Sequence, residues 1–495
     1  MAYGFIAFEG TLVALIIPHP AQLCQTATDV THVCYDSHAR ATCRAMDDLA
    51  SPRLQLAGAL LTRRALLLRR TRARLLRSRR FHAGLSIFRT ARRARCPGVG
   101  RAARLCFRVA EQLRVEARSP AELRVAVGLF RLAMNGSRAL RPRARERLLL
   151  MMLQRGHSLT SRAVQQQLAA GGFGVLLSPV VIHYPLDAAA AAGVTIPPSL
   201  APPRPGVYAI DGALPVGMLQ RLCTALGPDS PFWQEHGYAC GAYASPFFSY
   251  VHALDCAPRH GFERVMHAVL RHVRARYPAA SKARYAEWWA HCRPHGVGHQ
   301  MHFDSADEGR GELRHPIVST ALYLTSGVGG PTLVTTQASG DTSLASAGYM
   351  ALPKRNRLLM FDGRLLHAVL PGRGVVPASQ RSPARRVTLM IAFWPSLRER
   401  PAKRPAAARP FPHAAVAAAH TGKMDATSGG ATWPRLFDWS RKEDGKPVRE
   451  EDAGDMASSS LLVGPVEVWR PARQGTRLGE GEHMPSYDEC FQTLC

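Results

Sequence analysis

The sequence predicts an α+β fold in which a β core follows a series of helices. Between residues 316 and 394, short apolar runs recur at regular intervals, divided by glycine and proline. Such a pattern is typical of an all-β sandwich or barrel. Longer stretches ahead of them place apolar residues at helical spacing. The chain has 495 residues, 46% of them hydrophobic, which is enough for two or three domains with a substantial core.

The N-terminal part divides into an unassigned segment and a basic helical region. Residues 1–50 show no clear period. In residues 54–76, leucines recur every seven residues and arginine fills the other faces, which predicts a basic amphipathic helix. Residues 101–155 are also predicted to be helical, ending at a glycine that is placed to cap the helix. We therefore expect a mostly helical, Arg-rich region over 51–186.

The rest of the chain is predicted to form a linker, a second domain and a tail. Residues 187–205 are crowded with proline and alanine, which predicts a linker. The domain over 206–396 opens with a strand and a helix, has an amphipathic helix at 262–277, and continues with the short strands. Residues 397–495 lose this periodicity, and we expect a low-complexity, disordered tail.

The charge is concentrated in one part of the chain. Residues 51–150 hold 26 arginines and 4 glutamates, against a net charge of +28 for the whole chain. This Arg-rich stretch favours a nucleic acid or an anionic membrane surface as a partner. The alternative is a loosely structured extension whose arginines reflect a compositional bias, since only 6 of the 64 basic residues are lysine.

No segment has the length of a membrane-spanning helix. The best apolar run, "TLVALII" at 11–17, is far shorter than the ~20 residues that a bilayer requires. The eleven cysteines include no C-x-x-C pair, which argues against a zinc knuckle or a disulfide framework. We expect a soluble, intracellular protein without a transmembrane segment.

Three residues form a candidate metal site. His302 and Asp304 are two apart, so on a strand both side chains point to the same face. His367, which begins the strand-like "HAVLPG", supplies a third donor. Two histidines and one carboxylate form the facial triad of non-haem Fe(II) oxygenases, but a zinc enzyme also uses this set. The spacing leaves both metals open.

An ordered set of motifs resembles a known family. It comprises "HFD" (302–304), "STALYL" (319–324), "GGPTLV" (329–334), "RLLMFDGRLLHAV" (357–369) and "RVTLMIAFW" (386–394). Together they make residues 206–394 similar to the catalytic domain of the 2-oxoglutarate, Fe(II)-dependent dioxygenases, and closest to the prolyl 4-hydroxylase-like branch.

The resemblance implies a fold, a set of cofactors and a set of site residues. The fold is a double-stranded β-helix, a jelly-roll relative, with flanking helices. Fe(II) is held by His302, Asp304 and His367, which are also the catalytic residues. The cosubstrates are 2-oxoglutarate and O2, and ascorbate is a candidate additional cofactor. The residues implied for binding 2-oxoglutarate are Arg386, Tyr323, Thr388 and His299.

The sequence departs from the family pattern in two places. His367 and Arg386 are 19 positions apart, about twice the usual interval, which makes Arg385 a rival anchor. Arg386 is preferred because it begins the R-x-T pattern. His299 stands where the family often has tyrosine. We assign His291 and His295 to a loop or to the surface.

The resemblance implies an enzyme that couples decarboxylation of 2-oxoglutarate to hydroxylation of a protein or peptide residue such as proline. A small-molecule or nucleic-acid oxygenase is an alternative. The nucleic-acid branch typically has a second arginine where this chain has Ala392. A third reading is a non-enzymatic binding protein that uses its basic region, with a degenerate jelly roll as a scaffold.

Overall fold

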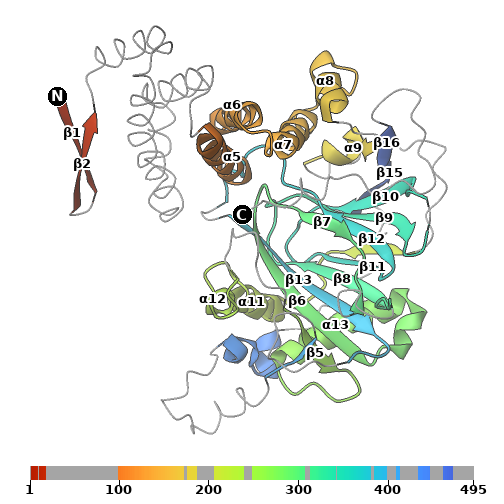
Figure 1. Cartoon of the computed structure of the whole chain (residues 1–495). Coiled ribbons are helices and arrows are strands. Elements are labelled where there is room, and N and C mark those ends of the chain that lie inside the picture. Colours follow the sequence, from red (N-terminus) through yellow and green to blue (C-terminus); the bar gives the residue numbers. More distant parts are fainter. Residues whose placement is uncertain are drawn as a thin grey trace. The chain divides into compact units, whose positions relative to one another are not determined.

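The computed structural model divides the chain into two compact units (Figure 1). One consists of residues 1–110 with 128–144, and the other of residues 111–127 with 145–495. The structure describes residues 2–8, 11–17, 99–171, 175–186, 206–238, 248–306, 313–341, 343–380, 384–398, 408–412, 433–445 and 461–471. The predicted helix at 54–76 and the predicted linker at 187–205 lie outside these residues.

Among its described residues, the first unit contains a β-hairpin, parts of two long helices and residues 141–144 at the start of a third. Strands β1 (Ala2–Phe8) and β2 (Thr11–Ile17) pair antiparallel, so the apolar run at 11–17 forms a strand. Helix α5 (Val99–Glu116) and helix α6 (Pro120–Gly136) each contribute one part to this unit. Within it, the Phe107 and Phe130 rings meet edge to face, with centroids 5.5 Å apart.

The helices predicted over 101–155 are present. After α5 and α6 come α7 (Arg141–Gln154), α8 (Arg162–Gly171) and the short α9 (Pro179–Ile182). Gly156 follows α7 with a φ of +83°, a conformation in which glycine is favoured, and its N–H bonds to the Leu153 carbonyl. The predicted capping glycine therefore ends α7.

Two sheets form the core of the second unit, which confirms the predicted mixed α+β class. Within the described residues, the larger sheet has the order β14-β5-β6-β13-β8-β11-β4 and the smaller has the order β15-β10-β9-β12-β7. The strands of the larger sheet are β4 (Val207–Ile210), β5 (Tyr250–Ala253), β6 (Tyr285–Pro294), β8 (Val318–Tyr323), β11 (Leu358–Asp362), β13 (Arg385–Trp394) and β14 (Arg409–Pro410). Those of the smaller are β7 (His299–His302), β9 (Thr332–Ala338), β10 (Ala347–Ala351), β12 (Leu365–Val369) and β15 (Leu462–Glu467).

The chain passes repeatedly from one sheet to the other. β8 lies in the larger sheet, β9 and β10 in the smaller, β11 in the larger, β12 in the smaller and β13 in the larger. Residues of both sheets share a buried cluster, including Tyr323 and Phe361 from one and Val334 and Ala351 from the other. The sheets therefore pack face to face, and β7, β12 and β13 carry most of the predicted site residues.

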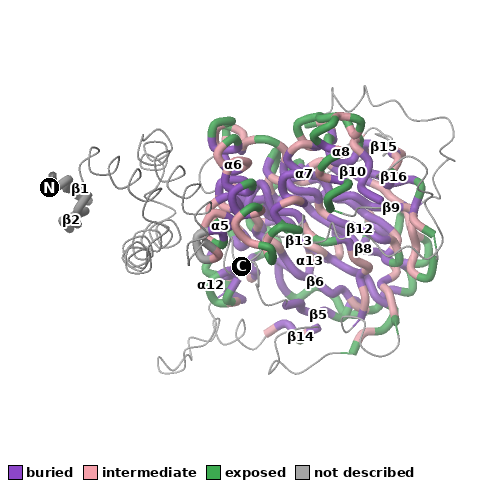
Figure 2. Tube along the Cα trace, turned by 45° about the horizontal axis from the view of Figure 1, so that its top comes forward, coloured by how far each residue is buried: buried purple, intermediate pink, exposed green. Residues whose placement is uncertain are grey.

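Helices cover the outer face of each sheet (Figure 1). Helices α11 (Val216–Ala225), α12 (Pro231–Glu235) and α13 (Gly261–Arg276) bury their apolar sides against the larger sheet. On the smaller sheet, α7, α8 and α9 share a core with β9, β10 and β12. In Figure 2 most of the two sheets is purple, the colour of buried residues. The second half of the helical region is therefore part of the β domain's core rather than a separate domain.

The segment expected to be a disordered tail contributes buried structure wherever it is described. Strand β15 pairs with β10, and β16 (Trp469–Pro471) pairs with β3 (Val175–Leu177). Two 3₁₀ helices, η3 (Trp433–Phe437) and η4 (Arg441–Asp444), lie against α11. The expectation was wrong for these residues, because a few aromatic side chains anchor an otherwise aperiodic segment.

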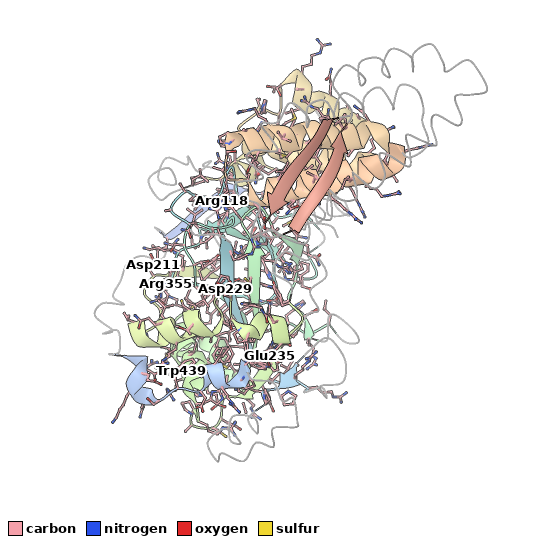
Figure 3. The ribbon with its side chains drawn as sticks, turned by 90° about the vertical axis from the view of Figure 1, so that its left-hand side faces the viewer. Arg118, Asp211, Asp229, Glu235, Arg355 and Trp439 are labelled. Carbon is pink, nitrogen blue, oxygen red and sulfur yellow. The ribbon has the colours of Figure 1, made fainter. Side chains whose placement is uncertain are left out.

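One of these anchors is Trp439, which is only 5% exposed and lies beside the helical layer (Figure 3). Its indole Nε1–H donates to Asp444 at 2.7 Å, and Asp444 pairs with Arg264 of α13 at 2.6 Å. A side chain at Gly261 would place its Cβ 2.2 Å from the Trp439 ring. Glycine at the start of α13 therefore makes room for the tail. No helix of the described residues is long and apolar enough to cross a membrane.

Candidate metal centre and anion-binding cavity

The three predicted metal ligands converge on one point. Strands β7 and β12 are paired so that His302 lies directly opposite His367, and Asp304 follows β7 by two residues. Asp304 Oδ1 lies 3.5 Å from His302 Nε2 and 3.6 Å from His367 Nε2. Two segments more than sixty residues apart are therefore brought together by strand pairing, and one donor atom from each residue lies within 4.8 Å of the others.

Hydrogen bonds to the backbone orient both imidazoles. His302 Nδ1 lies 2.9 Å from the Gln300 carbonyl, and His367 Nδ1 lies 3.0 Å from the Leu365 carbonyl. Because a carbonyl oxygen only accepts, each Nδ1 carries the proton and each Nε2 keeps its lone pair. On the carboxylate, Ser319 Oγ donates to Asp304 Oδ2 at 2.6 Å, which leaves Oδ1 facing the imidazoles. Such outer contacts typically fix the ligands of a metal.

The protonation states also suit a cation. Burial alone would raise the pKa of Asp304, but His367, His302 and the Ser319 hydroxyl lower it below its usual range. Burial and the neighbouring His302 lower the pKa of His367 to about 4. At neutral pH the site thus holds an ionised carboxylate and a neutral His367, as metal ligation requires. His367 Nε2 is buried and makes no hydrogen bond within the described residues, an arrangement that a bound metal would satisfy.

A cavity of about 370 Å³, including its open mouth, adjoins this centre. Its wall contains His302 and His367 together with two residues of β13, Arg386 and Thr388. The alternation of β13 turns these two toward the cavity, whereas Val387 and Leu389 point into the core beneath the helices. The metal centre and a cationic side chain therefore share one enclosure.

Arg386 is a buried cation without a carboxylate partner among the described residues. It is 3% exposed, its Nη1 donates to the Gly330 carbonyl at 3.3 Å, and its Nε makes no hydrogen bond. Burial lowers the pKa of Arg386 to about 10, so the group is still protonated at neutral pH. The Thr388 hydroxyl in the same wall is likewise buried and unbonded. Together they form a subsite suited to the carboxylate of a ligand.

The rival anchor, Arg385, lies on the other face of β13. Its Nη1 and Nη2 each lie 3.3 Å from Glu116 Oε1 at the end of α5. It does not line the cavity. Of the two adjacent arginines, Arg386 therefore faces the cavity, and Arg385 links α5 to the sheet.

Tyr323 is placed differently from the expectation. Its hydroxyl donates to Thr332 Oγ1 at 2.6 Å and lies 3.2 Å from the Ala351 carbonyl. Thr332 lines the cavity, and Tyr323 does not. The phenol is buried behind the wall, and the threonine hydroxyl faces the cavity in its place. The role of Tyr323 in binding 2-oxoglutarate stays a prediction.

Three further histidines lie on strands β6 and β7 or between them. His299 lines the cavity as expected, with its ring 4.8 Å from that of His302. His291 also lines it, from β6, and Tyr238 lies 3.4 Å from its Nδ1. His295 is 5% exposed and bonded on both ring nitrogens. The assignment to a loop or the surface was wrong for His291, because β6 was not recognised as a strand. His295 does lie in a loop, the turn that follows β6, but it is buried there. The recurrence of Trp289, His291 and Arg293 at every second position could have predicted that β6 is a strand.

Several solved structures of oxygenases are similar to part of this chain. A Pseudomonas putida prolyl-4-hydroxylase is 18% identical over 38% of this chain and 92% of that one, with a TM-score of 0.26. SnoK, a non-haem α-ketoglutarate-dependent carbocyclase from nogalamycin biosynthesis, is 12% identical over 38% and 79%, with a TM-score of 0.27.

A third similar structure is HygX from Streptomyces hygroscopicus, solved with nickel and 2-oxoglutarate bound. It is 14% identical over 41% of this chain and 90% of that one, with a TM-score of 0.25. These neighbours include members of the 2-oxoglutarate, Fe(II) oxygenase family, but identities and TM-scores this low assign no activity to this chain. No protein-family model and no curated protein matches the sequence.

Proposed function

We propose that this protein is a 2-oxoglutarate and Fe(II)-dependent oxygenase built on a double-stranded β-helix core. One observation carries the proposal. The two imidazoles of the donor set line the same cavity as a buried guanidinium that has no carboxylate partner among the described residues. An uncompensated buried charge is costly, and a dicarboxylate that also chelates the metal would compensate it. A simple zinc hydrolase has no need of this second subsite.

The roles of the residues follow from their placement. His302, Asp304 and His367 would hold Fe(II), which when bound supplies the activation of O2. Arg386 and Thr388 would hold the far carboxylate of 2-oxoglutarate, with His299 in the adjoining wall and Tyr323 acting through Thr332. The overall reaction consumes 2-oxoglutarate and O2, releases succinate and CO2, and converts a substrate C–H into C–OH. Ascorbate would keep the iron ferrous.

For the substrate, we propose a residue of a protein or peptide, such as proline. The motif resemblance points to this class, and the cavity wall supports it. Trp289, Met390 and Val369 contribute apolar surface to the cavity wall, which suits a hydrocarbon ring rather than a charged group. A small-molecule substrate is the alternative, and a screen of prolyl peptides against small cyclic compounds separates the two.

The full chain is the right material for the first test, because α7–α9 and the described parts of the tail share the core of the β domain. We expect it to convert 2-oxoglutarate to succinate with Fe(II) and ascorbate, slowly even without the main substrate. His302→Ala and Asp304→Ala should abolish this conversion. Absence of both turnover and 2-oxoglutarate binding in the wild-type protein loaded with Fe(II) would refute the proposal.

A second proposal concerns the basic helices, which we expect to bind nucleic acid. Between residues 99 and 171 there are 14 arginines and 4 glutamates. Glu111, Glu122 and Glu146 are buried, and Glu116 pairs with Arg385. The exposed charge of these helices is therefore positive. The exposed arginines include Arg104, Arg108, Arg124, Arg131, Arg138 and Arg141.

A membrane-surface helix would leave an apolar face uncovered, whereas the apolar sides of α5–α7 are buried. We expect the full chain to bind duplex DNA or single-stranded RNA with an affinity that falls steeply with salt. The triple variant Arg104→Gln, Arg108→Gln and Arg131→Gln should flatten that dependence. Binding to anionic vesicles but not to nucleic acid would contradict this proposal.

A further inference from the structure

The Gly329-Gly330 turn forms the support beneath the Arg386 side chain. Gly329 has a φ of +81°, and a Cβ there would lie 2.7 Å from Arg386 Cδ. The carbonyl of Gly330 accepts the hydrogen bond from Arg386 Nη1. A Cβ on Gly330 would lie 2.2 Å from the Leu370 carbonyl. The position of this turn therefore determines where the guanidinium can lie.

His295 holds this turn from behind. The Gly329 N–H donates to His295 Nδ1 at 3.1 Å, so Nδ1 keeps its lone pair and Nε2 carries the proton. His295 Nε2–H donates in turn to the Arg373 carbonyl at 3.1 Å, and the His295 carbonyl accepts the Gly372 N–H at 2.9 Å. The ring is 5% exposed, and both of its nitrogens are engaged in one tautomer.

Arg373, whose carbonyl accepts the His295 proton, is itself bonded to the helical layer that covers the smaller sheet. The Arg373 guanidinium donates to the Gln154 carbonyl at 3.1 Å and to the carbonyls of His183 and Tyr184. The Tyr184 hydroxyl lies 2.8 Å from the Arg373 N–H. Further along the same loop, Arg118 (Figure 3) donates to the Gln380 carbonyl at 3.0 Å. The loop between β12 and β13 is thus attached to the helices while its first residues brace His295.

We propose that His295 is a positioning residue for the anion subsite: by accepting the Gly329 N–H it fixes the turn that supports Arg386. This inference rests on the proposed function, because it assigns the effect to 2-oxoglutarate binding. His295 touches neither the metal centre nor the cavity wall. Its loss should weaken the binding of the cosubstrate while the three-residue donor set stays intact.

Two substitutions separate this role from a merely structural one. His295→Asn places an amide oxygen close to the Nδ1 position and keeps an acceptor for Gly329, whereas His295→Gln places its amide at the Nε2 position and removes that acceptor. Both shorten or distort the same buried side chain, so we expect similar losses of melting temperature. The two variants are therefore matched in burial and differ in one hydrogen bond.

The measurement is calorimetric binding of 2-oxoglutarate to the full chain loaded with Mn(II), in which no turnover takes place. We expect His295→Gln to raise the Kd about tenfold and His295→Asn to stay within about threefold of the wild type. Mn(II) affinity should be the same for all three proteins. Equal Kd values for the two variants, or no change in either, would overturn the inference.

A second readout is independent of the cosubstrate. Amide hydrogen exchange at Gly329 should be about tenfold faster in His295→Gln than in His295→Asn, because only the latter keeps an acceptor. If the wild-type protein fails to bind 2-oxoglutarate, the proposed function falls, and the exchange rates still decide whether His295 fixes the turn. Identical exchange in the two variants would refute the positioning role.

Discussion

The described residues of the second unit include two groups of two histidines and one carboxylate, and the groups differ in which ring nitrogens carry the protons. His302, Asp304 and His367 form one group, and His252, His260 and Glu263 form the other. In both, one donor atom from each residue lies within 4.8 Å of the others. By proximity alone the two groups are equivalent candidates for a metal.

Hydrogen bonds make the groups unequal. The Trp288 Nε1–H donates to His252 Nε2 at 3.2 Å, so the proton of the neutral His252 ring lies on Nδ1. That Nδ1 points at Glu263 Oε1, 3.4 Å away, as a donor rather than a ligand. Glu263 also accepts the Arg259 N–H at 2.6 Å. In the first group the protonated nitrogens point to backbone carbonyls, and the lone pairs point inward. A metal site is thus distinguished by its outer hydrogen bonds.

The largest expected difference between the two groups is in their affinity for a metal ion. We expect His302→Ala and His367→Ala to weaken Fe(II) or Co(II) binding on the order of 100-fold or more, because three donors become two. His260→Ala should leave the affinity and the stoichiometry unchanged. Anaerobic titration against a competing chelator checks both. A second equivalent of metal that is lost in His260→Ala would show that the second group is also a site.

A second test concerns the anion subsite, which accompanies the first group. Arg386→Gln should raise the Kd of 2-oxoglutarate on the order of 100-fold, since the proposed charge-assisted contact with the ligand carboxylate would be lost. Arg385→Gln is the matched control on the opposite face of β13, and it should change the Kd by less than about twofold while lowering stability slightly. A larger effect from Arg385 would reverse the assignment of the two arginines.

These arginines also show what the sequence can and cannot predict. The strands from β8 to β13 were predictable, because each is an apolar run bounded by glycine or proline, and His367 lies on one of them. His302 and Asp304 lie at the end of β7, a short polar strand that only the H-x-D motif marks. The opposite orientation of Arg385 and Arg386 follows from strand alternation, but the partner of Arg385 does not. Glu116 lies 269 positions away, on a helix whose docking no local pattern reveals.

The same limit explains the other differences. Strand β6 carries Trp288 and Trp289 side by side, facing the helical core and the cavity respectively, so it shows no contrast between polar and apolar faces. The tail is anchored by isolated aromatic residues such as Trp433 and Phe437, which pack against Trp288. Contacts of this kind depend on distant partners and leave no periodic pattern.

A third prediction tests the proton arrangement of the second group through stability. Trp288→Phe removes the donor to His252 Nε2 from a fully buried site and should lower the free energy of unfolding by about 1–3 kcal/mol. Succinate production at saturating 2-oxoglutarate should be unaffected, because this group takes no part in the proposed chemistry. Denaturant unfolding followed by fluorescence gives the first quantity. Loss of turnover in a folded Trp288→Phe protein would contradict the separation of the two groups.

The smallest expected effect is a pH dependence. Burial raises the pKa of Glu263, but the contacts with His252, the Arg259 N–H and His260 outweigh it and lower the pKa below its ordinary value. A lowered pKa stabilises the fold above the unfolded-state pKa of about 4.3, and this contribution is lost as the pH falls below that value. Glu263→Gln should therefore be less stable than the wild type at pH 7, and the difference should shrink between about pH 4.5 and 2.5. A constant difference across that range would contradict the assignment.

The pairing of β15 with β10 has a consequence for synthesis on the ribosome. Strand β10 is complete once residue 351 has been made, but its outer partner ends at residue 467. Until more than a hundred further residues have been translated, the nascent chain carries an uncapped sheet edge, a form that readily pairs with foreign strands. Among the described strands of the smaller sheet, β15 is therefore the last to be synthesised, and a stop codon placed before it would release a chain prone to self-association.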